Sequence, residues 1–186
     1  MGVRISLLNK HMTKIDKYIK QTKFTPAVVG YLRDGNKVLL GERIKVSSGL
    51  GQNLIAGIGG KIGDSEEIKN ETSEQAIDRE VNEEIKVKVL EKIERGRVRF
   101  IFMHKCPDSK WNQDVRIFEI TKWKGEPSET ESTKPIWFHK DKIPWERMWK
   151  DNQHWMPLVL SGKQVNAVFL FSGDNKIAEY RFDEVV

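Results

Sequence analysis

The sequence predicts an α+β fold in which one mixed β-sheet is covered by helices on both faces. Short runs rich in β-branched and aromatic residues, separated by turn signals, occupy most of the 186-residue chain. One strongly periodic helical segment interrupts these runs, and a second helical stretch lies near the C-terminal end. Since each helix must bury an apolar stripe, we expect the helices to pack against the sheet as an α-β-α sandwich.

Composition limits the class of protein. The length suits one domain with its own core, and 38% hydrophobic with 32% charged residues is typical of a small protein with a large exposed surface. The single cysteine, Cys106, excludes an internal disulfide and fits a reducing compartment, so we expect a cytoplasmic protein. No apolar run approaches the roughly 20 residues of a membrane span, and no secretory signal is present. The net charge of +5 would favour an anionic partner such as a nucleotide, although scattered surface lysines explain it equally well.

The N-terminal 22 residues stand apart from the rest of the chain. Leu8, Met12, Ile15 and Ile19 recur at helical spacing between lysines, which predicts an amphipathic helix before the first strand. We expect this helix to pack on the domain or on a neighbouring subunit. The chain is therefore divided into a helical extension, residues 1–22, and a domain, residues 23–186.

A β-hairpin opens the domain. Its predicted strands are Thr25–Leu32 and Lys37–Leu40, joined by a turn at Asp34–Asn36. Val46–Asn53 is rich in glycine and serine and is expected to be a loop. The apolar segment Leu54–Ile58 then leads into the centre of the chain.

The central helix is expected to begin after Thr72. Thr72 and Gln75, three residues later, form the pattern of a capping box. The buried stripe that follows is predicted to comprise Ala76, Ile77, Val81 and Ile85.

The second half of the chain contains further strands and one helical region. The predicted strands are Val87–Ile93, Gly96–His104, Asp114–Thr121, Pro135–His139, Gln164–Phe171 and Lys176–Phe182. Loops are expected over Cys106–Gln113 and Lys122–Lys134, and a turn at Gly173–Asn175. The helical region should run from about Pro144 to Leu160 and be interrupted by Pro157, because proline lacks the N–H that a helix needs.

The central helix carries the most informative chemistry. Glu80, Glu83 and Glu84 are spaced i, i+3 and i+4, so their carboxylates share one face. Three such carboxylates repel one another, and oxygen ligands at this density suit Mg²⁺ or Mn²⁺. A glutamate can also orient or deprotonate an attacking water. A solvated acidic face would explain Glu83 and Glu84 alone, but not the whole pattern with Arg79 and Glu71.

This pattern resembles the signature of the Nudix hydrolases, which cleave nucleoside diphosphates linked to another group. The matching residues are Glu71, Arg79, Glu80, Val81, Glu83, Glu84 and Val87. The chain departs from the signature twice. Ten residues rather than five separate Gly60 from Glu71, and Lys86 replaces the late glycine.

The resemblance implies roles for these residues. The Gly59 carbonyl, Glu80, Glu83 and Glu84 would hold Mg²⁺, or Mn²⁺, and Glu129 aligns with a glutamate that can reach the metal. Gly60 and Lys61 would meet phosphate. Glu84 is the first choice for the general base among the expected catalytic residues Arg79, Glu80, Glu83 and Glu84. If Arg79 pairs back to Glu71, its role is to fix the loop on the helix.

The segment from Met148 to Leu158 is similar to the Met-Trp-x-Asp-Asp-x-x-Trp segment of the MutT-related oxidised purine nucleoside triphosphatases, the 8-oxo-dGTP hydrolases. This similarity runs with gaps from about residue 25 to 185. It implies that Trp149 stacks on a purine and that Asp151 accepts hydrogen bonds from guanine N1–H and the 2-amino group. Core packing of Trp149 and helix capping by Asp151 are the structural alternatives.

Other pocket residues are also implied by the resemblance. Phe100 aligns with an aromatic residue of the base pocket, and Arg43 stands where the relatives have a lysine, although a core phenylalanine and a solvated strand end are common alternatives. Two departures affect base selection: Asn152 replaces the second aspartate of the segment, and Ala56 replaces a base-contacting asparagine. Losing one buried hydrogen-bonding group can shift selectivity strongly.

The resulting expectation is Mg²⁺-dependent hydrolysis of purine nucleoside triphosphates, with 8-oxo-dGTP as the leading substrate, to the monophosphate and pyrophosphate. The biological role would be nucleotide-pool sanitation. The alternatives are hydrolysis of a dinucleoside polyphosphate or a nucleotide sugar, and a non-catalytic nucleotide- or RNA-binding module. We expect no stable nucleic-acid partner and a monomer or weak dimer.

Overall fold

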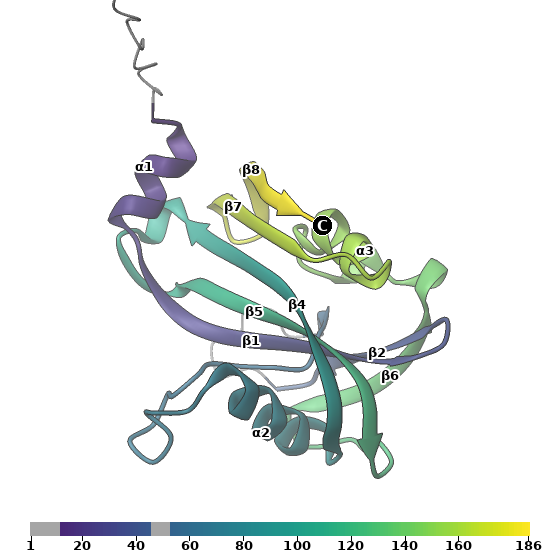
Figure 1. Ribbon diagram of the computed structural model, residues 1–186. Coiled ribbons are helices and arrows are strands. Elements are labelled where there is room, and N and C mark those ends of the chain that lie inside the picture. The colour runs from purple at the N-terminus through teal and green to yellow at the C-terminus, as the bar shows by residue number, and fades with distance from the viewer. Residues whose placement is uncertain (1–11, 46–52) are drawn as a thin grey trace, which may run out of the picture.

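The computed structural model describes residues 12–45 and 53–186, which form one mixed eight-stranded sheet with helices on both faces (Figure 1). The strands are β1 (Lys23–Asp34), β2 (Lys37–Arg43), β3 (Ile55–Ala56), β4 (Lys88–Phe102), β5 (Asp108–Lys124), β6 (Thr133–His139), β7 (Val165–Gly173) and β8 (Lys176–Val185). The α-helices are α1 (Lys14–Gln21), α2 (Ser73–Ile85) and α3 (Asn152–Leu160). Leu8 and all of the predicted Val46–Asn53 loop except Asn53 lie outside the described residues.

The strand order is β3-β2-β1-β5-β4-β7-β8, and β6 pairs with β2. The β1–β5 and β4–β7 pairs are parallel, whereas the other pairs are antiparallel. The predicted mixed sheet is therefore confirmed, and its parallel pairs bring together strands that are far apart in the sequence.

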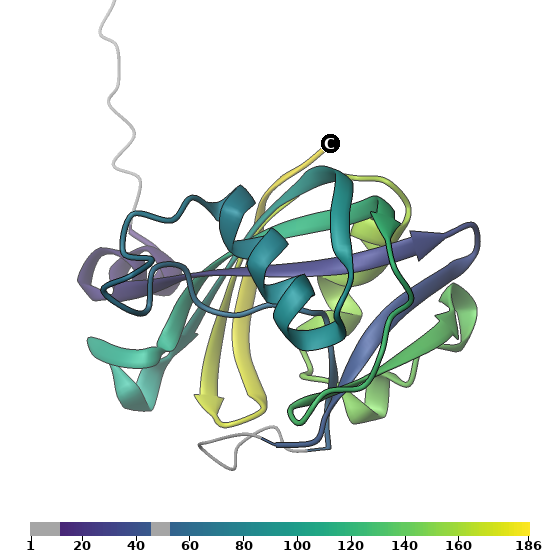
Figure 2. The ribbon, with the colours of Figure 1, turned by 90° about the horizontal axis from the view of Figure 1, so that it is seen from below.

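Helix α2 covers one face of the sheet, and Figure 2 shows it lying across β1 from that side. Its stripe of Ala76, Ile77, Val81 and Ile85 is fully buried, as predicted, against a cluster that includes Phe118. Helix α3 covers the opposite face, where Trp155, Met156 and Val159 pack with aromatic residues of β4 and β7. The predicted α-β-α sandwich is confirmed.

Helix α1 packs on the sheet as well. Thr13 caps it through a capping box with Asp16, and Ile15, 2% exposed, packs against Ile101, Val168 and Leu170. Because side chains alternate along a strand, Ile101 points to the face opposite Phe100 and Phe102. The expected N-terminal helix is confirmed over Lys14–Gln21, but Met12 precedes it and is 50% exposed, so its predicted place in the apolar stripe is wrong. The division into residues 1–22 and 23–186 stays a prediction.

The predicted loop Cys106–Gln113 is wrong, because β5 begins at Asp108. Asp108 pairs with Lys23, and Gln113 pairs with Thr25 on one side and Phe100 on the other. The buried side chain of Asn112 accepts a hydrogen bond from the Phe102 N–H (2.9 Å). Polar residues that bond to neighbouring strands thus hide the start of β5 from a hydrophobicity pattern.

Other strand limits differ from the prediction for similar reasons. Strand β4 is continuous from Lys88 to Phe102 and absorbs the expected break as register shifts near Gly96. The expected loop Lys122–Lys134 is shorter, since β5 extends to Lys124 and β6 begins at Thr133.

The expected helix Pro144–Leu160 is only partly correct. A short 3₁₀ turn covers Trp145–Arg147, and α3 begins at Asn152. Pro157 lies inside α3 without ending it, and the Ser161 N–H still donates to the Pro157 carbonyl (3.1 Å). The proline removes one helical hydrogen bond, and the buried side chains around it hold the turn.

Candidate active site

Helix α2 presents the acidic residues on the side away from its buried stripe. The capping box of Thr72 and Gln75 fixes where the helix begins. Glu80 and Glu84 are half-buried, whereas the Glu83 side chain is 58% exposed. The carboxylates of Glu80 and Glu84 are therefore partly shielded from solvent, whereas that of Glu83 is exposed to it.

Arg79 joins this helix to the preceding loop. Its Nε lies 2.8 Å from Glu71 Oε1, and its Nη2 lies 3.0 Å from Glu71 Oε2, a two-pronged ion pair. Nη2 also donates to the Lys61 carbonyl (3.0 Å), and Nη1 contacts Glu80 (2.8 Å) and Glu83 (3.0 Å). The guanidinium thus holds the loop, Glu71 and the acidic face in one arrangement.

The longer loop before Glu71 keeps this arrangement. The Gly63 N–H donates to Glu71 Oε2 (3.3 Å), and the Glu71 N–H donates to the Ile68 carbonyl (2.9 Å). The extra residues therefore fold into turns that return Glu71 to the start of the loop. At the other end of α2, Lys86 adopts the left-handed conformation (φ 61°, ψ 28°) that a glycine takes without strain.

The segment that contains Gly59 and Gly60, called the glycine segment below, runs beside β1. It touches the acidic face of α2, which carries Glu80, Glu83 and Glu84. The Val28 N–H donates to the Gly60 carbonyl (2.8 Å), and the Gly59 N–H donates to Glu84 Oε2 (3.3 Å). A Cβ at Gly60 would lie 2.4 Å from Glu80 Oε1, and a Cβ at Gly59 would lie 2.1 Å from the Val28 carbonyl oxygen. Only glycines fit between β1 and these carboxylates.

Burial dominates the electrostatics of the acidic face. It raises the pKa of Glu84 to about 7, with Arg43 acting in the opposite direction and Glu80 adding to the rise. Burial also raises the pKa of Glu80, and Arg79 opposes it. Carboxylates that are desolvated and close to one another are a donor set that a divalent cation would stabilise.

The donor chemistry fits a hard divalent cation, although the side chains are not gathered around one. Within residues 12–45 and 53–186, no three His, Cys, Asp or Glu side chains converge tightly enough to hold a metal ion. Arg79 occupies Glu80 and Glu83 instead, and the exposed Glu83 side chain has room to turn. A Cβ at Gly60 would collide with Glu80, so the glycine lets this carboxylate lie directly against the backbone of the segment.

The structure does not bring Glu129 into this group. Glu129 is exposed in the connection between β5 and β6. Its neighbours hold that connection to α2: the Ser128 N–H donates to the Ile85 carbonyl (3.0 Å), and the Thr130 hydroxyl donates to the Glu84 carbonyl (3.0 Å). The backbone is therefore near the acidic helix, while the predicted contact of the Glu129 carboxylate with a metal stays a prediction.

A cavity of about 560 Å³ opens beside Gly59 on the α3 side of the sheet. It brings together residues from β1, β2, β3, β4, β5 and β7, from α3 and the segment before it, and from the segment around Gly59 and Gly60. The predicted substrate-binding residues that line it are Arg43, Gly60, Lys61, Phe100, Trp149, Asp151 and Asn152. Ala56 lines it as well.

Aromatic rings form much of the cavity wall. Phe102 stacks on Phe171 with ring centroids 4.8 Å apart and meets Trp149 and Trp111 edge to face at 6.2 Å and 6.1 Å. Planar apolar walls of this kind accept a flat heterocycle, because bases stack on aromatic faces. Trp149 lines the cavity and also packs on the core, so its two alternatives are compatible.

Asp151 lies deep in the same cavity and is 3% exposed. Trp155 Nε1 donates to Asp151 Oδ2 (2.7 Å), and Asn152 Nδ2 lies 3.4 Å from the same oxygen. Burial raises the pKa of Asp151 to about 6, and the Trp155 hydrogen bond opposes this rise. Although Asp151 precedes α3, its side chain makes no capping hydrogen bond, so helix capping does not explain it.

Several cavity residues were missed by sequence reasoning. Tyr31, Lys110, Trp111 and Gln113 also line the cavity. Three of them lie where a loop was expected, so their inward direction was hidden. Pairing of Gln113 with Phe100 across β4 and β5 puts both side chains on one face, and only the strand register reveals this.

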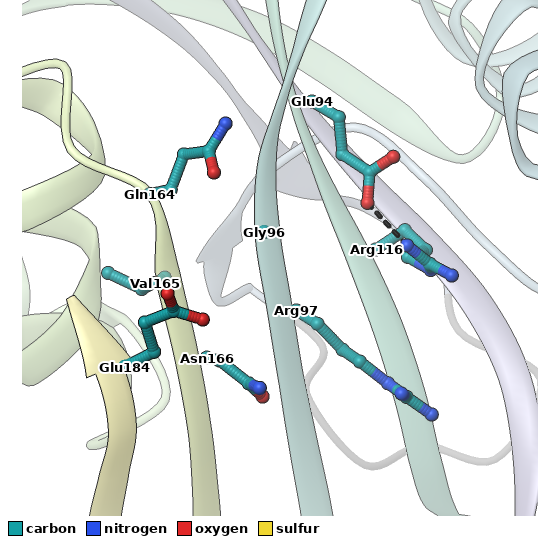
Figure 3. A pocket seen from close by; sticks show the side chains of 8 residues that line it. All are labelled: Glu94, Gly96, Arg97, Arg116, Gln164, Val165, Asn166 and Glu184. Atoms are coloured by element: carbon teal, nitrogen blue, oxygen red, sulfur yellow. Dashed lines mark hydrogen bonds and ion pairs between the residues drawn. The ribbon is translucent and has the colours of Figure 1, made fainter. Parts of the chain in front are cut away.

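A smaller hollow of about 250 Å³ lies where β4, β5, β7 and β8 meet (Figure 3). Arg116 there pairs with Glu94 (2.6 Å), and Arg97 pairs with Asp114. Since these arginines are neutralised by carboxylates, the larger cavity with Arg43, Lys61 and Lys110 is the better site for an anionic ligand.

Comparison with known proteins shows which family the chain belongs to. Residues 23–159 match the family model described as NUDIX domain. The chain belongs to the Nudix family and is an enzyme, a hydrolase. A mutator MutT protein of Bacillus halodurans has a similar fold, with a TM-score of 0.67 and 21% identity over 86% of this chain and 98% of that chain.

Two other relatives are more similar to this chain in sequence. The oxidized purine nucleoside triphosphate hydrolase of Danio rerio is 38% identical over 151 residues, which are 80% of this chain and 88% of the relative. The protein of the same name from Mus musculus is 34% identical over the same shares. In the described part of the chain, no helix combines the length and apolarity needed to cross a membrane.

Proposed function

We propose that this Nudix hydrolase converts purine nucleoside triphosphates, including oxidised forms such as 8-oxo-dGTP, to the monophosphate and pyrophosphate. The observation that carries the proposal is the single cavity that joins the glycine segment beside Glu84 to an aromatic wall with a buried carboxylate. The names of the 34–38% identical relatives support the substrate class. The role would be sanitation of the nucleotide pool, and the single cysteine fits the cytoplasm.

Mg²⁺ is the proposed cofactor, with Mn²⁺ as a substitute. Glu80, Glu83, Glu84 and the Gly59 carbonyl would hold it, and Glu129 is a further candidate. Bound there, the cation would neutralise negative charge on the phosphate oxygens.

The chain's own residues would perform the remaining tasks. Arg43 and Lys61 line the cavity and would bind the phosphates. Glu84 would take the proton of the attacking water as its oxygen bonds to phosphorus and the bridging P–O bond breaks, which releases pyrophosphate. Arg79 would position the glutamates without touching the substrate, since its donors are already committed to Glu71, Glu80, Glu83 and the Lys61 carbonyl.

The base would occupy the aromatic part of the cavity. Trp149 would stack on the purine, and the Asp151 carboxylate would accept hydrogen bonds from it. Asn152 offers both a donor and an acceptor, whereas Ala56 offers neither, so both residues should affect which purine is preferred. Asn152→Asp and Ala56→Asn are expected to change the ratio of guanine-type to adenine-type turnover.

The test is pyrophosphate release from 8-oxo-dGTP, dGTP, 2-hydroxy-dATP and dATP with Mg²⁺. Glu84→Gln should lower kcat by about 10²–10⁴-fold, the usual contribution of a general base. Glu67→Gln, at an exposed position in the longer loop, is the matched control and should leave kcat unchanged.

Two results would contradict the proposal. Full Mg²⁺-dependent activity of Glu84→Gln would remove that residue from catalysis. Turnover confined to a dinucleoside polyphosphate or a nucleotide sugar would assign a different substrate, and binding without any turnover would indicate a nucleotide- or RNA-binding module.

A further inference from the structure

Tyr31 lies in the middle of β1 and lines the large cavity. The residue is 1% exposed, and its hydroxyl has no hydrogen-bond partner among the described residues. A buried hydroxyl without a partner lowers stability, because it has lost its hydrogen bonds to water and gained none. Phenylalanine would fill almost the same volume without this cost.

Tyr31 lies between Gly57 and Trp155 in the wall of the cavity. One edge of its ring lies against Gly57, where an added Cβ would be 2.7 Å from Tyr31 Cε1, directly after Ala56. On the other side, the rings of Tyr31 and Trp155 are 6.1 Å apart. Trp155 in turn holds Asp151.

Asp151 is close enough to act on the hydroxyl electrostatically. Burial, and next the charge of Asp151, raise the pKa of Tyr31 well above its usual value. The tyrosine therefore keeps its proton at any physiological pH and presents an O–H donor. A neutral donor and a carboxylate acceptor thus belong to two residues that line the same cavity and that both contact Trp155.

We propose that the Tyr31 hydroxyl is a specificity-determining group that donates a hydrogen bond to the 6-oxo group of a purine while Asp151 accepts the adjacent N1–H. A 6-oxopurine presents an acceptor next to a donor on this edge, which is the complement of the hydroxyl and the carboxylate. Adenine presents a 6-amino donor next to the N1 acceptor, and N1 would face a carboxylate oxygen. The inference rests on the proposed function for the purine class and adds which edge is read.

The test compares Tyr31→Phe with the parent on dGTP, dITP and dATP. Inosine keeps the 6-oxo group and N1–H but lacks the 2-amino group, so it isolates the proposed contact. We expect kcat/KM to fall about 10-fold or more for dGTP and dITP, because the 6-oxo group is left unpaired in a buried site, and less than about threefold for dATP. Tm should be unchanged or higher, since the substitution removes an unpaired hydroxyl.

Tyr180→Phe is the matched control, because Tyr180 lies on β8 with 44% exposure and does not line the cavity. It should leave all three kcat/KM values unchanged. Equal kcat/KM changes for 6-oxo and 6-amino substrates in Tyr31→Phe would overturn the inference. A marked fall in Tm would do the same, because it would show that the hydroxyl already has a partner within the protein.

A binding measurement separates this inference from the proposed function. Titration with dGMP, dIMP and dAMP, followed by fluorescence of the cavity tryptophans, needs neither metal nor turnover. If the parent hydrolyses no purine triphosphate, the proposed function fails, and weaker dIMP binding with unchanged dAMP binding in Tyr31→Phe still supports the tyrosine contact. Equal Kd changes for both monophosphates, or no binding of any of the three by the parent, would refute it.

Discussion

Asp151 is the residue at which stability and the proposed recognition oppose each other. Its pKa rises from 3.8 to about 6 because the carboxyl is buried. A raised carboxyl pKa means that the folded state binds the proton more tightly than the unfolded state. The free energy of unfolding therefore falls as pH rises from about 4 to above 6, and the whole penalty is present at pH 8.

Asp151→Asn should remove this penalty. We expect the free energy of unfolding to rise by about 1–3 kcal/mol at pH 8 and to change little at pH 4, while guanine-type activity falls. Urea unfolding at both pH values measures the effect. Asp141→Asn, at a 71% exposed side chain, is the control. An equal gain in stability at pH 4 would show that the charge of Asp151 is not the cause.

Lys86 and Tyr31 mark how far single residues could be interpreted from the sequence. The missing signature glycine was visible, but only the backbone shows that Lys86 keeps the left-handed turn, with its N–H bonded to the Asn82 carbonyl. Tyr31 carried no sequence signal, because a tyrosine within a strand is ordinary. Its unpaired hydroxyl is a property of its surroundings.

At the scale of elements, the glycine segment packs between α2 and β1, and its two glycines contact different neighbours. A Cβ at Gly60 would meet a Glu80 carboxylate held by Arg79, whereas a Cβ at Gly59 would meet the backbone of β1. A shift of the Glu80 side chain should mainly lower catalytic activity. A shift of β1 should mainly lower the free energy of unfolding.

Gly60→Ala should therefore lower kcat by about 10–100-fold through misplaced glutamates and change the free energy of unfolding by less than about 1 kcal/mol. Gly59→Ala should cost about 2 kcal/mol or more, because β1 must shift. Pyrophosphate release and urea unfolding of the two variants provide the measurements. If both variants lose only stability, the contact between Gly60 and Glu80 has no catalytic importance.

The elements themselves were predictable where local signals agree. Helix α2 followed from its capping box and buried stripe, and the first and last hairpins followed from their turns. The start of β5 did not, since Asn112 and Gln113 are polar and are held by partners on β1 and β4. The predicted interruption at Pro157 failed for the opposite reason. Proline disfavours a helix locally, but packing of the α3 side chains in the core keeps the helix through this position.

For the whole molecule, the face that binds α1 lies opposite the cavity. Ile15 packs on Ile101, Val168 and Leu170, and Phe100 and Phe102 point the other way. Ile15→Ala should lower the free energy of unfolding by about 2–5 kcal/mol and leave kcat/KM unchanged.

Thermal unfolding and steady-state kinetics at a temperature where both proteins are folded test this expectation. Met12→Ala, at a 50% exposed position, is the control and should change neither quantity. Loss of activity in folded Ile15→Ala would show that α1 acts on the site through the sheet.

The overall topology lies beyond local sequence signals. The layers could be predicted because helices and strands bury apolar faces, but the parallel pairs β1–β5 and β4–β7 join distant segments. These pairs help to place the aromatic wall in the same cavity as Gly59, whose N–H bonds to Glu84 of α2. The reaction class was therefore visible in one stretch of sequence, whereas the proposed ligand cavity is assembled from six strands, helix α3 and the segments around Gly59 and Asp151.

The contact between α1 and the last hairpin also governs the order of events on the ribosome. Arg181 reaches Asp16 at 2.9 Å across 165 residues of chain, and Val168 and Leu170 belong to β7. Helix α1 is thus translated before β7 and β8, which supply part of its docking surface. Part of the apolar face of α1 therefore stays uncovered until β7 has been synthesised, so α1 can complete its docking only late in folding.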